Sequence, residues 1–255
     1  MNEQNSSQDD FFVGYSRKIP LSIKKFLLKF IPLLVLSTLA FAVVLPLVHS
    51  HFNTGRVNSN QEFEGLLLTE PIPHIMVPRP GNTNSDSGYS RYILAGLRKV
   101  SASPEILELA GKWVKLSGLP IHRNDTTLIA SRSAEEIEPP SSDALKPEPG
   151  VSLGEFSLHG EIIDTKCYLG TMKPGQTKTH RGCAIRCISG GVPPGLITHN
   201  KQGDEVYFAL VDRDGKAVNE NILDLVADPV TVTGEVVKYG DLLVLKADPD
   251  SYEVL

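Results

Sequence analysis

The chain has 255 residues, a hydrophobic content of 41 % and a formal net charge of −5 at neutral pH. The apolar content is sufficient for ordinary hydrophobic cores, and the mildly acidic charge argues against a nucleic-acid-binding surface, which would be basic. The sequence contains no nucleophile-elbow motif with a catalytic triad, no glycine-rich phosphate loop and no His-Glu-x-x-His motif. It therefore does not indicate a hydrolase or a nucleotide-dependent enzyme, and we favour a non-enzymatic role.

An apolar run from Phe30 to Val48 dominates the N-terminal part of the chain. Its length matches what a helix needs to cross a hydrocarbon core of roughly 30 Å, so we expect a transmembrane helix over 26–49. Basic residues are concentrated before the run, within a tail (1–25) that we expect to be mostly disordered. This bias predicts a single-pass protein of the bacterial inner membrane with a cytoplasmic N-terminus and a periplasmic bulk. A cleaved signal peptide is the alternative, because Ala40-Phe41-Ala42 has the form of a cleavage site.

Two later segments, 114–129 and 230–245, resemble each other at a constant offset of 116 residues. Each reads as an alternating strand, a polar turn ending in Asp, and a second strand. A short helical segment is expected before each, at 104–110 and 219–226. With the strand candidates upstream, both halves have the order strand, strand, strand, helix, strand, strand, which is the connectivity of a five-stranded OB-type barrel.

The sequence thus predicts a mainly β fold in which the N-terminal helix is followed by two tandem OB-like five-stranded barrels. We place the first OB-like domain at 60–134 and the second at 152–255. The segment 135–151 is rich in proline, serine and acidic residues, a composition that resists regular structure, so we interpret it as a linker.

All three cysteines of the chain lie in an insert over 165–194, which we expect between the first two strands of the second barrel. If Lys178 to Ser189 is helical, His180, Cys183 and Cys187 lie on one stripe of the helix. Imidazole and thiolate groups on one stripe are typical ligands of a transition-metal ion.

Cys167 follows the end of a predicted strand and could approach this stripe from the barrel. The four side chains would then supply three cysteines and one histidine, the ligand set of a tetrahedral zinc site, and the soft sulfur ligands also suit Cu(I). Asp164 could accept a hydrogen bond from His180 and orient its ring toward the metal.

Two other uses of the cysteines stay open. In an oxidising compartment Cys167 could pair with Cys183 or Cys187 in a structural disulfide that pins the insert to the barrel and leaves one thiol over. The second alternative use is thiol–disulfide exchange, which would require an exposed thiolate.

The run Asp164-x-x-Cys167-Tyr-Leu, His180-x-x-Cys183-Ala-x-x-Cys187 and Gly191-Val-Pro resembles a motif of bacterial envelope proteins to which no activity is assigned. In that group the motif lies on an OB-like barrel, and the resemblance covers roughly residues 155–247. It implies a bacterial envelope protein and singles out the three cysteines and His180. The spacing of Cys183 and Cys187 is also similar to that of copper-handling proteins of the Sco type.

We therefore expect a membrane-anchored, periplasm-facing accessory protein with a metal-binding or redox-sensitive site. Its role would be in assembly, or as a subunit of an envelope or respiratory complex. The expected partners are the lipid bilayer and another envelope membrane protein, and the expected cofactor is zinc or copper. The alternatives are a non-catalytic interaction module with a structural disulfide and a thiol–disulfide oxidoreductase.

Overall fold

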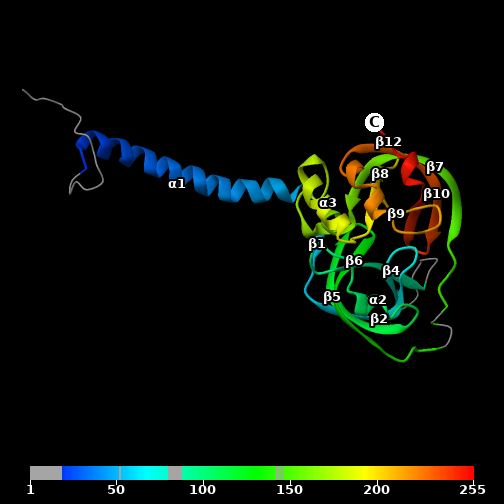
Figure 1. Cartoon of the computed structure of the whole chain (residues 1–255). Coiled ribbons are helices and arrows are strands. Elements are labelled where there is room, and N and C mark those ends of the chain that lie inside the picture. The colour runs from blue at the N-terminus through cyan, green and yellow to red at the C-terminus, as the bar shows by residue number, and fades with distance from the viewer. Residues whose placement is uncertain (1–18, 52, 80–87, 142–143, 145) are drawn as a thin grey trace, which may run out of the picture. The chain divides into compact units, whose positions relative to one another are not determined.

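A computed structural model describes residues 19–51, 53–79, 88–141, 144 and 146–255 (Figure 1). Most of the tail expected to be disordered, 1–25, lies outside the described residues. The chain divides into two compact units, Met1–His51 and Phe52–Leu255.

The described part of the first unit is the helix α1 (Leu21–Ser50), which confirms the predicted N-terminal apolar helix. Its stretch Ile23–His49 has a mean hydropathy of 2.5, and its length and composition fit both a membrane span and a signal sequence. The hydroxyls of Ser37 and Thr38 donate to the carbonyl oxygen of Leu34 at 2.9 and 2.8 Å. The polar side chains of the run are thus satisfied within the helix, as an apolar environment requires.

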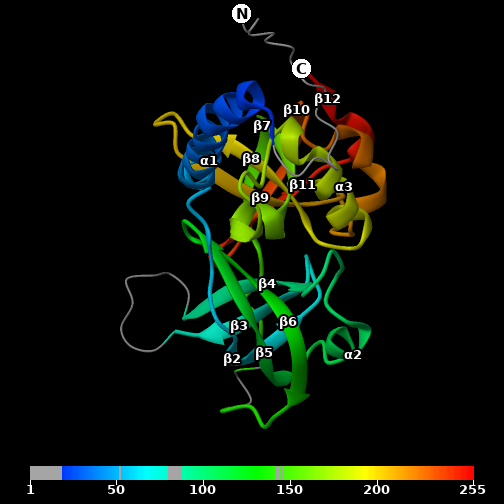
Figure 2. The same ribbon diagram turned by 90° about the vertical axis from the view of Figure 1, so that its left-hand side faces the viewer.

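The second unit begins with a closed five-stranded barrel (Figures 1 and 2). The strands lie in the order β5-β2-β3-β4-β6, and pairing of β5 with β6 closes the barrel. Only β4 and β6 pair in parallel among these five strands. The short helix α2 (Pro104–Leu107) precedes β5, and β1 (Arg56–Val57) extends the sheet beyond β5. The five strands are β2 (Gln61–Leu68), β3 (His74–Pro78), β4 (Tyr89–Gly96), β5 (Trp113–Arg123) and β6 (Thr126–Glu136).

The second barrel repeats this topology. Its strands lie in the order β10-β7-β8-β9-β11, with β9 and β11 parallel and with β10–β11 pairing as the closure. The short strand β12 (Glu253–Val254) adds to β10, after a 3₁₀ turn η6 (Pro249–Ser251). The five strands are β7 (Val151–Asp164), β8 (Pro194–His199), β9 (Glu205–Val211), β10 (Pro229–Tyr239) and β11 (Leu242–Lys246).

The internal repeat seen in the sequence corresponds to these matched strands. β5 and β10 start and end at the same offset of 116 residues, and each forms an antiparallel hairpin with the following strand. The predicted fold class, a mainly β chain with two OB-like five-stranded barrels, is confirmed. The reason is the alternation along both hairpins, where apolar side chains such as Val114, Leu116, Val230 and Val232 are fully buried.

The helix expected at 219–226 was a wrong prediction. The chain forms two 3₁₀ turns there, η4 (Asn219–Asn221) and η5 (Leu223–Leu225). The Asn219 side chain does not cap a helix. Its amide donates to the carbonyl oxygens of Ile188 and Val192 at 2.8 and 3.0 Å, and these residues belong to the cysteine insert. The side chain therefore makes a tertiary contact in place of a local one.

The segment interpreted as a linker contacts the outside of the first barrel. Ile137 and Ala144 pack with Leu66, Met76 and Trp113, and Ala144 is buried. The strand β6 continues to Glu136, two residues beyond the expected end of the first domain at 134. A proline-rich segment can therefore add apolar contacts to a barrel without forming regular structure itself.

The two barrels share one hydrophobic cluster. It joins Ile121 and Leu128 of the first barrel to Tyr168, Tyr207 and Val244 of the second, together with Cys167 and Cys187. The cysteine insert is thus part of the core between the barrels, so its conformation depends on both of them.

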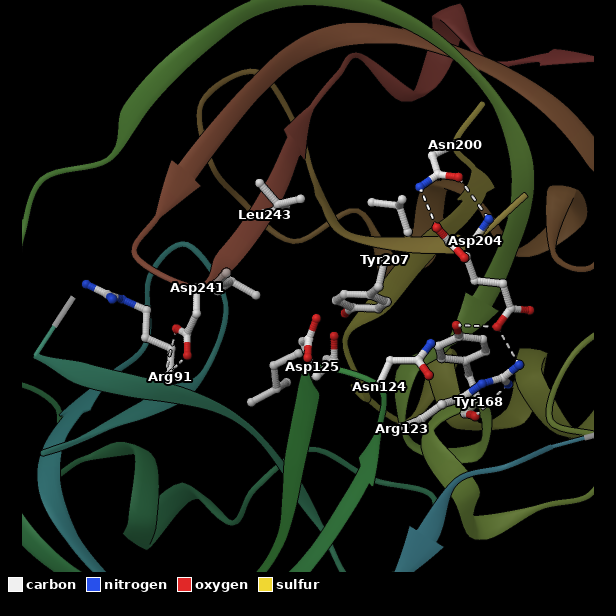
Figure 3. Close-up of a pocket in the computed structure, with 15 residues that line it drawn as sticks. Arg91, Arg123, Asn124, Asp125, Tyr168, Asn200, Asp204, Tyr207, Asp241 and Leu243 are labelled. Atoms are coloured by element: carbon white, nitrogen blue, oxygen red, sulfur yellow. Dashed lines mark hydrogen bonds and ion pairs between the residues drawn. The ribbon is translucent and has the colours of Figure 1, made fainter. Parts of the chain in front are cut away.

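Arg123, at the end of β5, connects the barrels electrostatically. Its guanidinium lies 2.5 Å from the Glu205 carboxylate, 3.2 Å from the Tyr168 carbonyl oxygen and 4.2 Å from the centre of the Tyr168 ring (Figure 3). The Arg123 side chain is only 7 % exposed, so this contact is screened little by solvent.

Buried His74 gives the stability of the fold a defined pH dependence. Burial lowers the pKa of His74 from 6.5 to about 4. The folded protein then binds fewer protons than the unfolded chain between these values. The stabilisation that neutral His74 gives to the folded protein is complete above pH 6.5. About 3 kcal/mol of the unfolding free energy is lost as the pH falls toward 4.

We therefore expect His74→Asn, which keeps a donor for the Ile72 carbonyl oxygen, to flatten the pH dependence of the unfolding free energy between pH 6.5 and 4. Denaturant unfolding of both proteins across this range measures the difference. Parallel curves for the two proteins would contradict the prediction.

Candidate metal centre

The cysteine insert connects β7 to β8 and contains three short helical pieces. These are a π-helical turn η2 (Cys167–Thr171), a 3₁₀ turn η3 (Lys178–His180) and the helix α3 (Arg181–Ser189). The helix predicted over 178–189 is present, with its first three residues in the tighter 3₁₀ form. The amide of Val192 donates to the Cys187 carbonyl oxygen and ends the helix before the strand β8.

The first turn of the insert is held by the segment that precedes β1. The Asn53 side-chain amide donates to the carbonyl oxygens of Cys167, Tyr168 and Met172 at 3.4, 2.8 and 3.1 Å. A Cβ atom on Gly55 would lie 1.9 Å from the Leu169 carbonyl oxygen, so only glycine allows the two backbones to approach this closely. The position of Cys167 is therefore fixed by its backbone as well as by its side chain.

Asp164 links the strand end to the insert. One oxygen of its fully buried carboxylate accepts from the Cys167 backbone N–H at 2.8 Å. The other lies 3.1 Å from Nε2 of His180. This contact orients the His180 ring and leaves Nδ1 as the ring nitrogen that could bind a metal.

The predicted ligands converge on Cys167. The ligand atoms of Cys167, His180 and Cys183 all lie within 4.8 Å of one another, and so do those of Asp164, Cys167 and Cys187. Ligands at about 2.3 Å from a tetrahedral ion are separated by about 3.8 Å. Within each group the separations thus exceed this value by at most about 1 Å, and either group could hold a metal ion. Among the described residues, no single group within 4.8 Å contains all four predicted ligands.

Lys99, a residue of the first barrel that the sequence did not single out, also contacts the cysteine cluster. Its Nζ lies 2.5 Å from Sγ of Cys183 and 3.9 Å from Sγ of Cys187. The loop that carries it is docked on the insert, where the Ser101 N–H donates to the Gly190 carbonyl oxygen at 2.8 Å. A Cβ on Gly190 would come within 1.9 Å of the Lys99 carbonyl oxygen, so the docking requires glycine there.

A second lysine, Lys166, fixes the same loop. Its Nζ donates to the carbonyl oxygens of Gly96 and Arg98, the latter at 2.8 Å. The site is thus built from both barrels, and backbone contacts hold the loop that carries Lys99. No sequence signal identifies Lys99, because it is 84 residues away from Cys183 and the two meet only across the barrel interface.

The thiols interact with one another. The hydrogen bond from the Cys167 thiol lowers the pKa of Cys187, and the same bond, together with burial, raises the pKa of Cys167. The Cys183 sulfur in turn raises the pKa of the Lys99 ammonium. A lowered pKa favours the thiolate form of Cys187, which is the form that binds soft metals.

All three cysteines are free thiols in this structure. Cys167 and Cys187 are buried, and Cys183 is partly exposed. Arg181, which follows His180 in the insert, pairs with Asp228 at 2.6 Å and donates to the Asp224 carbonyl oxygen. Lys99 is the cation in contact with the sulfurs.

The fold and the site define a class of protein: tandem OB-type barrels with an N-terminal apolar helix and a cysteine–histidine cluster that could hold a metal. No protein-family model and no curated protein matches the chain. Among solved structures, a deletion mutant of the single-stranded DNA-binding protein from Thermus aquaticus is 13 % identical, with 77 % of this chain and 94 % of that chain covered. Its TM-score is 0.23, which is too low to support any inference about this chain.

Proposed function

We propose that the protein is a membrane-anchored, periplasm-facing accessory protein of the bacterial envelope that binds one metal ion through Cys167, His180, Cys183 and Cys187. The observation that carries the proposal is that two groups of candidate ligands meet at Cys167, one with His180 and Cys183 and the other with Asp164 and Cys187. Cys167, His180 and Cys187 are buried, so an ion bound there would be shielded from water.

The chemistry of the donors favours zinc or Cu(I). Three sulfurs and one nitrogen are soft ligands, whereas calcium and magnesium prefer oxygen. The ion would supply a fixed charge that holds the insert together, while Asp164 orients His180 and Lys99 lies beside the sulfurs. A structural site of this kind has four protein ligands, so it suits a role in assembly or as a subunit of an envelope or respiratory complex.

The membrane location is supported by the apolar helix α1 and by the basic residues that precede it. On this proposal, the lipid bilayer and another envelope membrane protein are the partners. The barrels would then carry the metal centre outside the cytoplasm, where unprotected thiols oxidise.

The test is metal analysis of the full chain, purified anaerobically in detergent. We expect about one zinc or copper ion per chain, and a loss of most of the metal in Cys183→Ser and in His180→Ala. His199→Ala is the matched control, because His199 is an exposed histidine at the end of β8 outside the cluster, and it should keep the metal. Equal metal content in all four proteins would contradict the proposal.

A structural disulfide is the second candidate, favoured by the proximity of Cys167 and Cys187, whose sulfur atoms lie within 4.8 Å of each other. It would make the protein a non-catalytic interaction module. Mass spectrometry of the alkylated protein separates the two: a metal-free chain with two cysteines oxidised supports the disulfide, and three alkylated thiols after metal removal support the metal centre.

A further inference from the structure

A cavity of about 510 Å³ is lined by residues of the first barrel, the linker and the second barrel. Its lining includes Leu68, His74 and Arg91 of the first barrel, Glu148 of the linker and Tyr239 of the second barrel. The cavity thus combines one guanidinium with an apolar wall and an aromatic ring, a composition typical of small-ligand sites.

Arg91 is the unusual member of this lining. Its side chain is 1 % exposed, yet its Nη1 is buried with no hydrogen-bond partner among the described residues. Its Nη2 lies 3.5 Å from the Glu148 carboxylate, at the limit of a hydrogen bond. In Figure 3 the guanidinium extends away from Asp241, whose carboxylate accepts instead from the Arg91 backbone N–H at 3.0 Å.

His74 lies on the same face of the sheet as Arg91. It pairs with Ile93 across β3 and β4, and Ile93 is two residues from Arg91, so the two side chains are diagonal neighbours about 7–8 Å apart. Nδ1 of His74 contacts the Ile72 carbonyl oxygen at 2.8 Å, and the pKa of the buried ring is about 4. At neutral pH the ring is therefore uncharged, and Arg91 supplies the positive charge of the cavity floor.

We propose that this cavity is a binding site for a carboxylate group and that the linker residue Glu148 is its internal occupant. A planar carboxylate matches two parallel N–H groups of a guanidinium, and Glu148 engages only one of them, at long range. An incoming carboxylate that uses both Nη1 and Nη2 would replace Glu148 without changing the net charge. A phosphate would add a second negative charge near Glu70, which the single guanidinium does not balance.

The carboxylate could belong to a small organic acid or to a glutamate in an extended peptide. Glu148 itself is flanked by Pro147 and Pro149, which keep the chain extended. Two probes separate these sources: propionate, and the peptide Ac-Pro-Glu-Pro-amide, which copies residues 147–149. Binding of either one supports the site and identifies the kind of ligand.

The experiment is isothermal titration of both probes into the full chain in detergent. Glu148→Gln removes the internal carboxylate, so we expect it to bind at least one probe about tenfold more tightly than the unmodified chain. Glu70→Gln is the matched control, since Glu70 lines the same cavity and carries the same charge. It leaves Glu148 beside Arg91, and we expect an increase below about twofold.

Arg91→Met in the Glu148→Gln background should abolish binding, with Trp113 fluorescence used to verify that the barrel is folded. The comparison of Glu148→Gln with Glu70→Gln does not depend on that variant. Absence of binding to Glu148→Gln at about 10 mM of either probe, or an equal gain in Glu70→Gln, would overturn the proposal.

Discussion

Replacement of Arg123 by methionine should lower the free energy of unfolding of the two-barrel unit by about 3 kcal/mol. The side chain is buried between the barrels, where it pairs with Glu205 and lies over the Tyr168 ring. Methionine fills a similar volume but leaves the Glu205 carboxylate, which is only 18 % exposed, without its cation. The Tyr168 hydroxyl, 3.1 Å from Glu205, compensates only in part.

Urea unfolding followed by Trp113 fluorescence measures this effect. Arg79→Met is the matched control, because Arg79 also pairs across the barrels, with Asp241 at 2.7 Å, but both side chains are about a quarter exposed. An exposed pair contributes at most about 1 kcal/mol. If the two variants lose equal stability, burial of the Arg123 contact is not what makes it important.

Replacement of Asp164 by alanine should weaken metal binding by about 10- to 100-fold while leaving all four proposed ligands in place. The carboxylate holds both the Cys167 backbone and the His180 ring, so its removal frees two ligands at once. Asp164 is fully buried, so water has little opportunity to replace the lost acceptor. Competition with a chelator of known affinity, followed by metal analysis, gives the ratio of the two binding constants.

Asp228→Asn is the control for this measurement. Asp228 also binds the insert, through Lys178 and Arg181, but it contacts none of the proposed ligands. It should keep the metal affinity within about threefold of the unmodified chain. A similar loss in both variants would mean that the insert unfolds and that Asp164 has no particular role in orienting His180.

The fold could be predicted because its signals are local and repeated. The alternation of apolar residues gave two hairpins at the same spacing, and the strands β5 and β10 occupy those positions. The error at 219–226 has a tertiary cause, since the Asn219 side chain binds the carbonyl oxygens of the insert and the local helical pattern is overridden. The linker composition likewise could not reveal that Ala144 packs beside Trp113.

The candidate site was predictable where its geometry is local. The spacing of His180, Cys183 and Cys187 along one helix required no knowledge of the fold. The approach of Cys167 follows from its place after a strand end. The contribution of Lys99 could not be predicted, because it depends on how the first barrel docks on the insert of the second. The same holds for the contact between Arg123 and Glu205.

X-ray absorption spectroscopy at the edge of the bound metal tests the central proposal most directly. For the full chain we expect three sulfur ligands at about 2.3 Å and one nitrogen ligand at about 2.0–2.1 Å. In His180→Ala the nitrogen contribution should disappear or be replaced by oxygen. A coordination sphere of oxygen and nitrogen only, or a protein without metal in which two of the three cysteines form a disulfide, would contradict the assignment.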